Sequence, residues 1–296
     1  MVQYVTASTI SLYPHVTVLR ARGQWHNHVL TLIIHDRFSL KSPISMPSLK
    51  NDYDENGYVI VDGLIAPGDF ASLEQACQRA ISRTRSGEWK HRRTVGKQFP
   101  PYGDEDPDSW GVQHVMHPEL GETAFAKWYT SEPLTQVITQ LMDCKEEDLQ
   151  MELFNLLINP MSHDFALRWH RDDVPGTASE EEEIQALGVS HYGIQWNTTA
   201  EQRALSITSA PPENPLDMPG AFRVTLQPGQ TVFYNNNILH CGAYDSKALR
   251  ATLHASMGDV RGGSARARNV LQHGLEWMKE ESFSKSLNEK EWEAWA

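Results

Sequence analysis

The sequence is poor in cysteine and in long apolar runs. It has 3 cysteines in 296 residues, and their odd number and wide spacing argue against a secreted disulfide framework. A membrane span needs about 18 consecutive apolar residues, whereas the best run here covers only residues 29–34, with Thr31 inside it, and is closed by His35. These absences predict a protein of a reducing compartment, which we expect to be cytoplasmic, without a membrane partner.

Positive charge is also in short supply. Lys and Arg number 26 against 38 Asp and Glu, so the formal net charge is −12. Such a surface repels phosphate backbones and anionic headgroups, and we therefore expect no nucleic-acid partner. Apolar residues make up 40% of the chain and charged residues 22%, which is typical of a globular protein with its own core.

The chain divides into two parts of different texture. Residues 1–50 show no sustained helical or strand period, and we expect them to form a poorly ordered N-terminal extension. Residues 51–296 are expected to form one domain, with a helical part over 64–145, a β-core over 149–258 and a C-terminal segment over 259–296. Helices that precede strands favour an α+β fold over alternating βαβ units.

Local patterns predict the elements of this domain. The spacing of apolar residues predicts a helix that begins at Pro67 and ends near Arg83, and another over residues 125–142. The acidic run 180–183 is expected to be a solvated loop or a first helical turn. Runs of β-branched and aromatic residues predict strands over 58–61, 153–158, 165–170, 193–196, 222–226, 231–234 and 249–257.

Three residues have the types and spacing of a metal site. His170 and Asp172 lie two positions apart at the end of a predicted strand, so alternation places both on one face, where they can bind one ion together. His240 follows the predicted strand 231–234. Two imidazoles and one carboxylate on one side of a metal leave the opposite positions open, which suits non-haem Fe(II) chemistry with oxygen.

A candidate anion-binding residue follows this set. Arg250 precedes Thr252, His254 and Ser256 on the polar face of a predicted strand. An arginine held on a rigid strand can bind a carboxylate through two parallel hydrogen bonds, as a dicarboxylate such as 2-oxoglutarate requires.

From about residue 52 to Gly258 the sequence resembles the phytanoyl-CoA dioxygenase family of Fe(II)/2-oxoglutarate oxygenases, and most closely its fungal members. Residues 1–50 have no recognised counterpart there. The resemblance is carried by the segment 54–64, the His-x-Asp of His170 and Asp172, the Pro-Gly-Gln turn at 228–230, His240 and Arg250.

The resemblance implies a double-stranded β-helix, the jelly-roll core of cupin-like proteins, with flanking N-terminal helices. It implies that His170, Asp172 and His240 are the catalytic iron ligands. It further implies that Arg250 binds the distal carboxylate of 2-oxoglutarate and that Trp196 lies near this co-substrate. The implied enzyme is an oxidoreductase that hydroxylates or desaturates a small organic substrate with O2, releasing succinate and CO2; a homodimer is compatible with these expectations.

The sequence departs from the family after Asn197. Residues 198–205 continue without the strand that family members place before a Pro-Gly-Ser-His signature, so the core is expected to lack one strand, and an unclosed barrel exposes strand edges. One alternative is therefore an inactive or binding-only relative with an incomplete barrel. Another is a metal-dependent cupin-like hydrolase or isomerase, which needs no 2-oxoglutarate.

Other polar residues receive structural interpretations. Asp173 competes with Asp172 for the ligand role, but strand alternation turns it away. His163 is expected in a surface loop, and His114 and His117 are expected to be hydrogen-bonded histidines without a metal. The basic run 90–93 is expected to be a solvated loop.

Overall fold

The computed structural model describes residues 32–35, 49–96, 108–188, 192–199, 221–288 and 291. Within these residues no helix combines the length and the apolar character needed to cross a membrane. The helices are α1 (Leu49–Asn56), α2 (Pro67–Arg85), α3 (Thr123–Tyr129), α4 (Glu132–Met142), α5 (Glu180–Leu187), α6 (Ser264–Gln272) and α7 (Glu281–Ser286). The strands are β1 (Leu32–His35), β2 (Tyr58–Val61), β3 (Arg92–Thr94), β4 (Ser109–Val112), β5 (Leu149–Ile158), β6 (Phe165–Ala166), β7 (Gly193–Thr199), β8 (Ala221–Val224), β9 (Thr231–Asn235), β10 (His240–Tyr244) and β11 (Ala251–Asp259).

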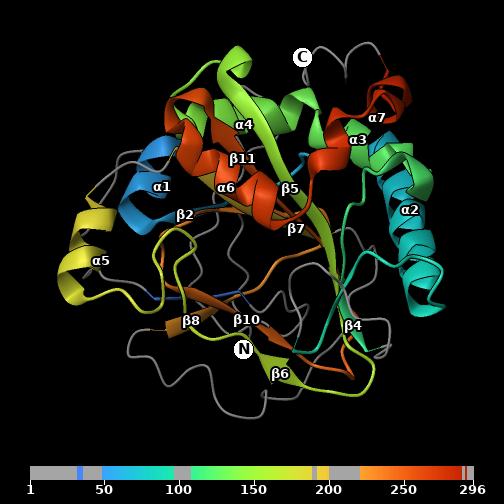
Figure 1. Ribbon diagram of the computed structural model, residues 1–296, viewed down its shortest axis with the longest axis horizontal. Helices are drawn as coiled ribbons and strands as arrows, with labels where there is room; N and C mark the ends of the chain where they lie inside the picture. The colour runs from blue at the N-terminus through green and yellow to red at the C-terminus, as the bar shows by residue number, and fades with distance from the viewer. Residues whose placement is uncertain are drawn as a thin grey trace, which may run out of the picture.

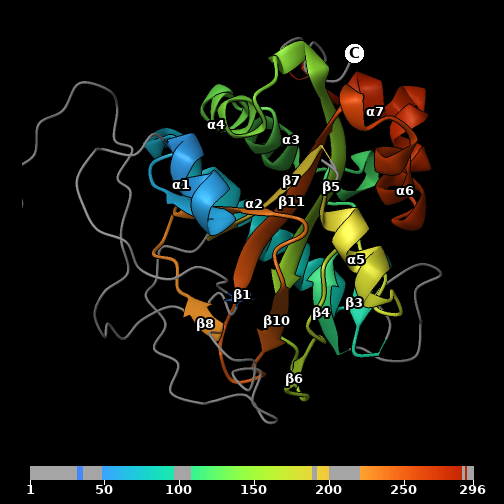
Figure 2. The ribbon, with the colours of Figure 1, turned by 90° about the vertical axis from the view of Figure 1, so that its left-hand side faces the viewer.

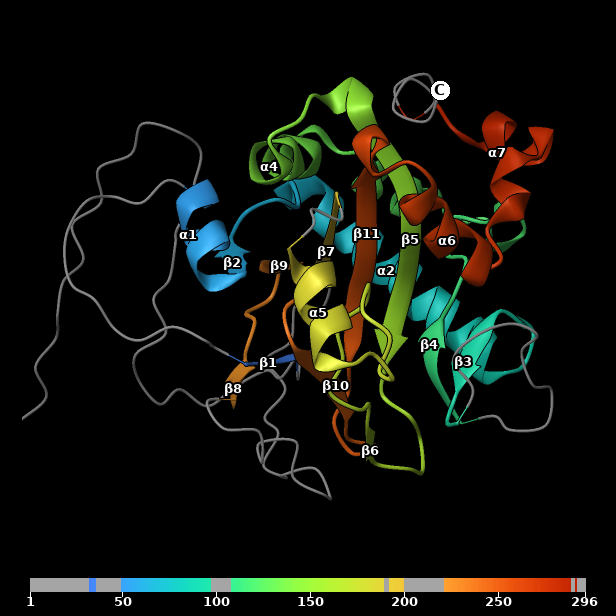
Figure 3. The ribbon, with the colours of Figure 1, turned by 60° about the vertical axis from the view of Figure 1, so that its left-hand side comes forward.

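The larger of two sheets has seven strands in the order β2-β9-β7-β11-β5-β4-β3. All of its neighbouring strands are antiparallel. Its centre is the long pair β5 and β11, in which Leu253 lies opposite Leu156 (Figure 3). The fold is thus a mixed α and β fold with a large antiparallel sheet.

The smaller sheet has four strands in the order β6-β10-β1-β8. Strand β1 lies antiparallel to both of its neighbours, with Ile33 opposite Cys241 of β10 and opposite Arg223 of β8. Figure 2 shows these short strands grouped below the long strands of the larger sheet. A segment from the N-terminal 50 residues therefore lies inside this sheet.

Helices cover the outer face of the larger sheet, and the smaller sheet lies on its other side (Figure 1). The main hydrophobic core forms between the helices and this outer face, because alternate residues of each strand are apolar and point toward the helices. Trp196 of β7, Phe233 of β9 and Leu253 of β11 are buried there together with Leu134 and Ile138 of α4.

The inner face of the larger sheet is polar where the outer face is apolar. Gln195 and Asn197 of β7, Tyr234 of β9 and His254 of β11 alternate with the core residues. The register of the sheet places Gln195 opposite Tyr234 and Asn197 opposite His254. The space between the two sheets is therefore lined by groups that can bind a polar ligand.

Some predicted elements differ from the observed ones. The single helix predicted over residues 125–142 is two helices, α3 and α4, because Pro133 lies in the first turn of α4 and its ring cannot continue the preceding helix. The strand predicted over 165–170 is reduced to Phe165–Ala166. The prediction that the basic run 90–93 forms a solvated loop is wrong, because Arg92 and Arg93 are buried in β3.

Candidate metal centre

Backbone pairing brings the two candidate histidines together. The amide of His170 donates to the carbonyl oxygen of His240 at 3.0 Å, and the amide of His240 donates to that of His170 at 3.0 Å. This isolated antiparallel bridge joins the chain after β6 to the first residue of β10. The two imidazole centroids are consequently 4.4 Å apart.

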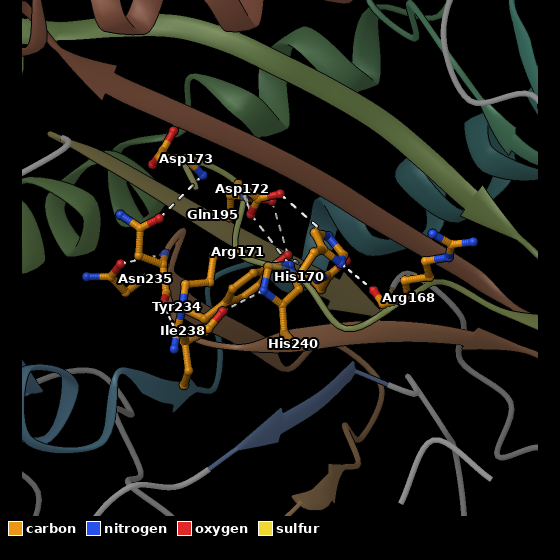
Figure 4. Close-up of polar contacts among 12 residues, drawn as sticks. Arg168, His170, Arg171, Asp172, Asp173, Gln195, Tyr234, Asn235, Ile238 and His240 are labelled. Carbon is orange, nitrogen blue, oxygen red and sulfur yellow. Dashed lines mark hydrogen bonds and ion pairs between the residues drawn. The ribbon is translucent and has the colours of Figure 1, made fainter. Parts of the chain in front are cut away.

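Hydrogen bonds fix the same tautomer in both rings. Nδ1 of His170 lies 2.7 Å from the carbonyl oxygen of Arg168, and Nδ1 of His240 lies 2.8 Å from that of Ile238 (Figure 4). A carbonyl oxygen only accepts hydrogen bonds, so each Nδ1 carries a hydrogen, and in the neutral form of each ring Nε2 then keeps a free lone pair. This is the arrangement in which a neutral imidazole binds a metal ion.

Asp172 completes the group. Its carboxylate oxygens lie 3.6 Å from Nε2 of His170 and 3.5 Å from Nε2 of His240. One ligand atom from each of the three residues falls within 4.8 Å of the others, and the described part of the chain contains no second such group. Ligand atoms about 2.0–2.2 Å from one ion in octahedral geometry are about 3 Å apart, so small side-chain shifts suffice to bind an ion.

The centre is buried on one side and open on the other. His240 is 5% exposed, whereas the side chains of His170 and Asp172 are 35% and 28% exposed. Burial lowers the pKa of His240, although the carboxylate of Asp172 opposes this effect. Burial therefore favours the neutral imidazole of His240, and a small molecule can approach from the side of His170.

A chain of polar groups on the inner face of the larger sheet holds the carboxylate. The side-chain amide of Gln195 donates to Oδ2 of Asp172. The hydroxyl of Tyr234 donates to Oε1 of Gln195 at 3.2 Å and accepts from the amide of Asn197 at 3.1 Å. Such contacts orient ligand carboxylates, and the sequence analysis did not single out Gln195 for this position.

The residue after Asp172 is held by a buried ion pair. Arg266 contacts Asp173 at 3.7 Å and binds both oxygens of Glu152 at 2.7 and 2.6 Å. The guanidinium lies against Gly193, where a Cβ atom would come within 2.4 Å of it. Asp173 thus points away from the centre toward Arg266 and fixes the loop that carries Asp172.

Arg250 lies immediately before β11, between the two sheets. Its Nη1 donates to the carbonyl oxygen of Ala243 of β10 at 3.3 Å, its Nε donates to the hydroxyl of Thr252 at 3.3 Å, and its guanidinium lies 4.5 Å from the ring centroid of Tyr244. Burial lowers the pKa of Arg250. No carboxylate in the described part of the chain forms an ion pair with it.

Tyr234 links this arginine to the candidate metal centre. Burial raises the pKa of Tyr234, the charge of Asp172 raises it further, and the charge of Arg250 lowers it. Both charges therefore act on one hydroxyl, so the cation and the candidate metal ligands face the same interior.

Trp196 does not lie where the sequence analysis expected it. Its side chain is on the outer face of β7, where its ring centroid is 5.6 Å from that of Tyr129 and 6.1 Å from that of Phe233. Strand alternation is the reason, since Gln195 and Asn197 occupy the inner face. The assignment of Trp196 to the co-substrate is therefore corrected to a core role.

The remaining histidines lie in other surroundings. His163 pairs with Asp108 at 2.5 Å. His114 donates from Nε2 to the carbonyl oxygen of His273 at 2.9 Å, and its ring stacks on that of His91 at 4.6 Å. The side chain of His117 accepts a hydrogen bond from the backbone amide of Glu119, in the 3-10 helix that follows it. This contact agrees with a structural role.

The chain matches no protein-family model, and no curated protein matches it. Solved structures do resemble it. AviO1 from Streptomyces viridochromogenes Tue57 has 15% sequence identity and a TM-score of 0.53, with 74% of this chain and 97% of AviO1 covered. EctD from S. alaskensis, solved with 2-oxoglutarate and 5-hydroxyectoine, has 14% identity and a TM-score of 0.51, with 85% of this chain and 88% of EctD covered.

A second structure of EctD holds bound Fe, and it covers 80% of this chain with 13% identity and a TM-score of 0.50. At these identities the likeness establishes a shared fold. The chain therefore has the fold of a protein solved with iron and with 2-oxoglutarate, and it carries a His-Asp-His triad on that fold.

Proposed function

We propose that this protein is an Fe(II)/2-oxoglutarate-dependent dioxygenase that hydroxylates or desaturates a small organic substrate. The observation that carries the proposal is the convergence of His170, Asp172 and His240, with both Nε2 atoms directed at one carboxylate. When bound, Fe(II) supplies the redox chemistry that couples O2 to the oxidation of 2-oxoglutarate, with release of succinate and CO2. The residues of this chain hold the ion, bind the co-substrate and limit the access of water.

Arg250 is the proposed anchor for the distal carboxylate of 2-oxoglutarate. Arg250 is half-buried, and a cation withdrawn from water without a counter-ion is costly unless an anion joins it. Its Nη2 donates no hydrogen bond to the described residues, while Nη1 and Nε are already engaged. A carboxylate bound at this guanidinium would lie beside Tyr234. The charge of Asp172 raises the pKa of this tyrosine and the charge of Arg250 lowers it.

The strand arrangement supports a double-stranded β-helix as the core. Four central strands of the larger sheet, β9-β7-β11-β5, face the four strands of the smaller sheet, β6-β10-β1-β8. This gives two layers of four strands with the candidate ligands between them. The presence of β1 in the second layer counts against the incomplete barrel of a binding-only relative.

Membership of the phytanoyl-CoA dioxygenase family, with fungal members as the nearest relatives, is the family assignment that we propose. It rests on the motifs from residue 54 to Arg250. The division into an N-terminal extension and one dioxygenase domain, a cytoplasmic location and a homodimer stay predictions.

The proposal is tested by anaerobic titration of the protein with Fe(II) and 2-oxoglutarate. We expect a weak visible charge-transfer band, together with slow release of succinate when O2 is admitted. His170→Ala is expected to abolish both, whereas His163→Ala, which removes an imidazole paired with Asp108, is expected to keep both. A wild-type protein that binds Fe(II) but gives neither band nor succinate would contradict the proposal.

Arg250→Ala separates this function from a metal-dependent hydrolase or isomerase. Loss of a buried charge-assisted contact costs about 2–5 kcal/mol, so the dissociation constant for 2-oxoglutarate should rise by at least about 30-fold. Metal binding without 2-oxoglutarate should be unchanged. Arg79→Ala, at a surface ion pair with Glu122, serves as the matched control and should leave both constants as in the wild type.

A further inference from the structure

Strand β1 comes from a part of the chain far from the rest of its sheet. In sequence order β7 is followed by β8, yet in space β1 lies between β8 and β10. Its four residues pair with β8 from Leu32 to His35 and with β10 from Leu32 to Ile34. The N-terminal segment thus supplies the strand that joins β8 to β10.

The smaller sheet depends on this strand. Among the described strands, β8 pairs with β1 alone. Of the strands that the structure describes, β10 otherwise pairs only with β6, through the pairs Ala243–Ala166 and Tyr244–Phe165, and it forms the bridge from His240 to His170. Without β1, the strand that carries His240 would keep one short neighbour and expose its other edge.

The register pairs β1 directly with the strand residue that is a candidate metal ligand. Ile34 is opposite His240, and Ile33 is opposite Cys241. Successive residues of an antiparallel strand direct their amides to opposite sides. Because the amide and carbonyl of His240 bond to His170, the backbone groups of Cys241 face β1.

We infer that residues 32–35, by pairing with β10, hold His240 in its position at the candidate metal centre. The N-terminal segment is thereby a positioning element of the site. The consequence for metal binding rests on the proposed function, whereas the strand pairing itself does not.

A disulfide tests the register in the full-length chain. Directly paired residues of antiparallel strands have Cα atoms about 4.5–5.5 Å apart, within the range that a disulfide spans. Ile33→Cys should therefore form a disulfide with the native Cys241. Burial raises the pKa of the Cys241 thiol to about 12, so oxidation in a glutathione redox buffer should run for many hours before peptide mapping by mass spectrometry.

Ile34→Cys is the matched control, since its partner in the register is His240 and not Cys241. We expect no disulfide to Cys241 in this variant. Absence of the disulfide in Ile33→Cys, or equal formation in both variants, would overturn the inference. Neither outcome depends on whether the protein binds iron.

Proline and alanine at position 33 test the effect on the site. Ile33→Pro removes a backbone donor on the side of Cys241, whereas Ile33→Ala keeps it. We expect Ile33→Pro to weaken Co(II) binding by at least about tenfold, as loss of supporting contacts around a metal does, and to speed amide exchange over residues 240–244. The dissociation constant of Ile33→Ala for Co(II) should stay within about twofold of the wild-type value, because the backbone hydrogen bonds between β1 and β10 are kept.

The outcomes separate the two proposals. Unchanged Co(II) affinity and unchanged exchange in Ile33→Pro would overturn the positioning role. Faster exchange over residues 240–244, in a wild-type protein that binds no Co(II), would support the strand and count against the proposed function. If Ile33→Pro does not fold, by circular dichroism, the disulfide of the Ile33→Cys variant decides the inference.

Discussion

The seven-stranded sheet and the four-stranded sheet differ in what holds them together. The larger sheet is built around β5 and β11, of 10 and 9 residues, and helices bury its outer face. The strands of the smaller sheet have only 2 to 5 residues, and one of them is supplied by the N-terminal segment. This contrast indicates that most of the stability lies in the larger sheet, while the candidate ligands lie where the smaller sheet meets it.

The largest expected effect concerns the outer face of the larger sheet. Trp196→Ala removes one of the largest fully buried side chains and should lower the free energy of unfolding by about 3–5 kcal/mol. Urea unfolding measures this change. In the folded fraction, Co(II) affinity should stay as in the wild type, because the side chain is on the face opposite Asp172. A loss below about 1 kcal/mol would contradict the core role.

Acid should destabilise the protein through its buried histidines. Burial lowers the pKa of His114 to about 4, and the charges of His91 and His117 add to this effect; burial and Arg93 lower the pKa of His273 to about 3. The unfolded chain binds these protons near pH 6.5, so stability is fully present above that pH and is lost as the pH falls through about 4.

For His114 alone the shift corresponds to about 3 kcal/mol. Unfolding free energies measured from pH 7 to pH 4 should show the loss. His114 has a positive φ of 57°, which asparagine tolerates, so His114→Asn should flatten the profile. A profile as steep as that of the wild type would rule out His114 as the cause.

A smaller effect should follow on the inner face of the same strand. Gln195→Leu removes the donor to Asp172 with little change in volume. Loss of a contact that orients a metal ligand typically costs about 10- to 100-fold in affinity, which calorimetry with Co(II) would measure. Gln150→Leu, at an exposed position of β5, is the matched control. Equal affinity in both variants would show that Asp172 needs no support from Gln195.

The smallest effect is expected at α5, which lies outside both sheets. Ser179 and Glu182 form a reciprocal capping box at its first turn. Ser179→Ala should cost about 1 kcal/mol of helix stability, seen as faster amide exchange within α5. Ser179→Thr should preserve the cap, and neither change should alter the unfolding of the larger sheet. Faster exchange in β5 or β11 would mean that α5 is coupled to the core.

The sequence was a good guide to residues that act through local spacing. The helix from Pro67 follows from the helix period. The His-x-Asp pair and the later His240 were singled out by residue type and spacing, and the structure brings these three candidate ligands together. Gln195 could have been found from the same alternation, because it and Trp196 are neighbours on one strand. To decide which of the two side chains lies on the inner face of the sheet, one must know which face the helices cover.

The position of β1 could not be predicted from local pattern. The apolar run 29–34 is visible in the sequence, but nothing near it provides a strand partner. Its neighbours, β8 and β10, are at the other end of the chain, and the pairing of such distant segments depends on the whole fold. The split between α3 and α4 was also missed, although Pro133 is a local signal for it.

The place of β1 in the sheet sets the order in which the protein is assembled. During synthesis residues 32–35 emerge early, but their partners β8 and β10 begin at residues 221 and 240. Domains fold as units once their contacts are available, and contacts between distant segments are slow to form. The smaller sheet therefore cannot be completed until residues 221–244 have been synthesised, which is most of the polypeptide.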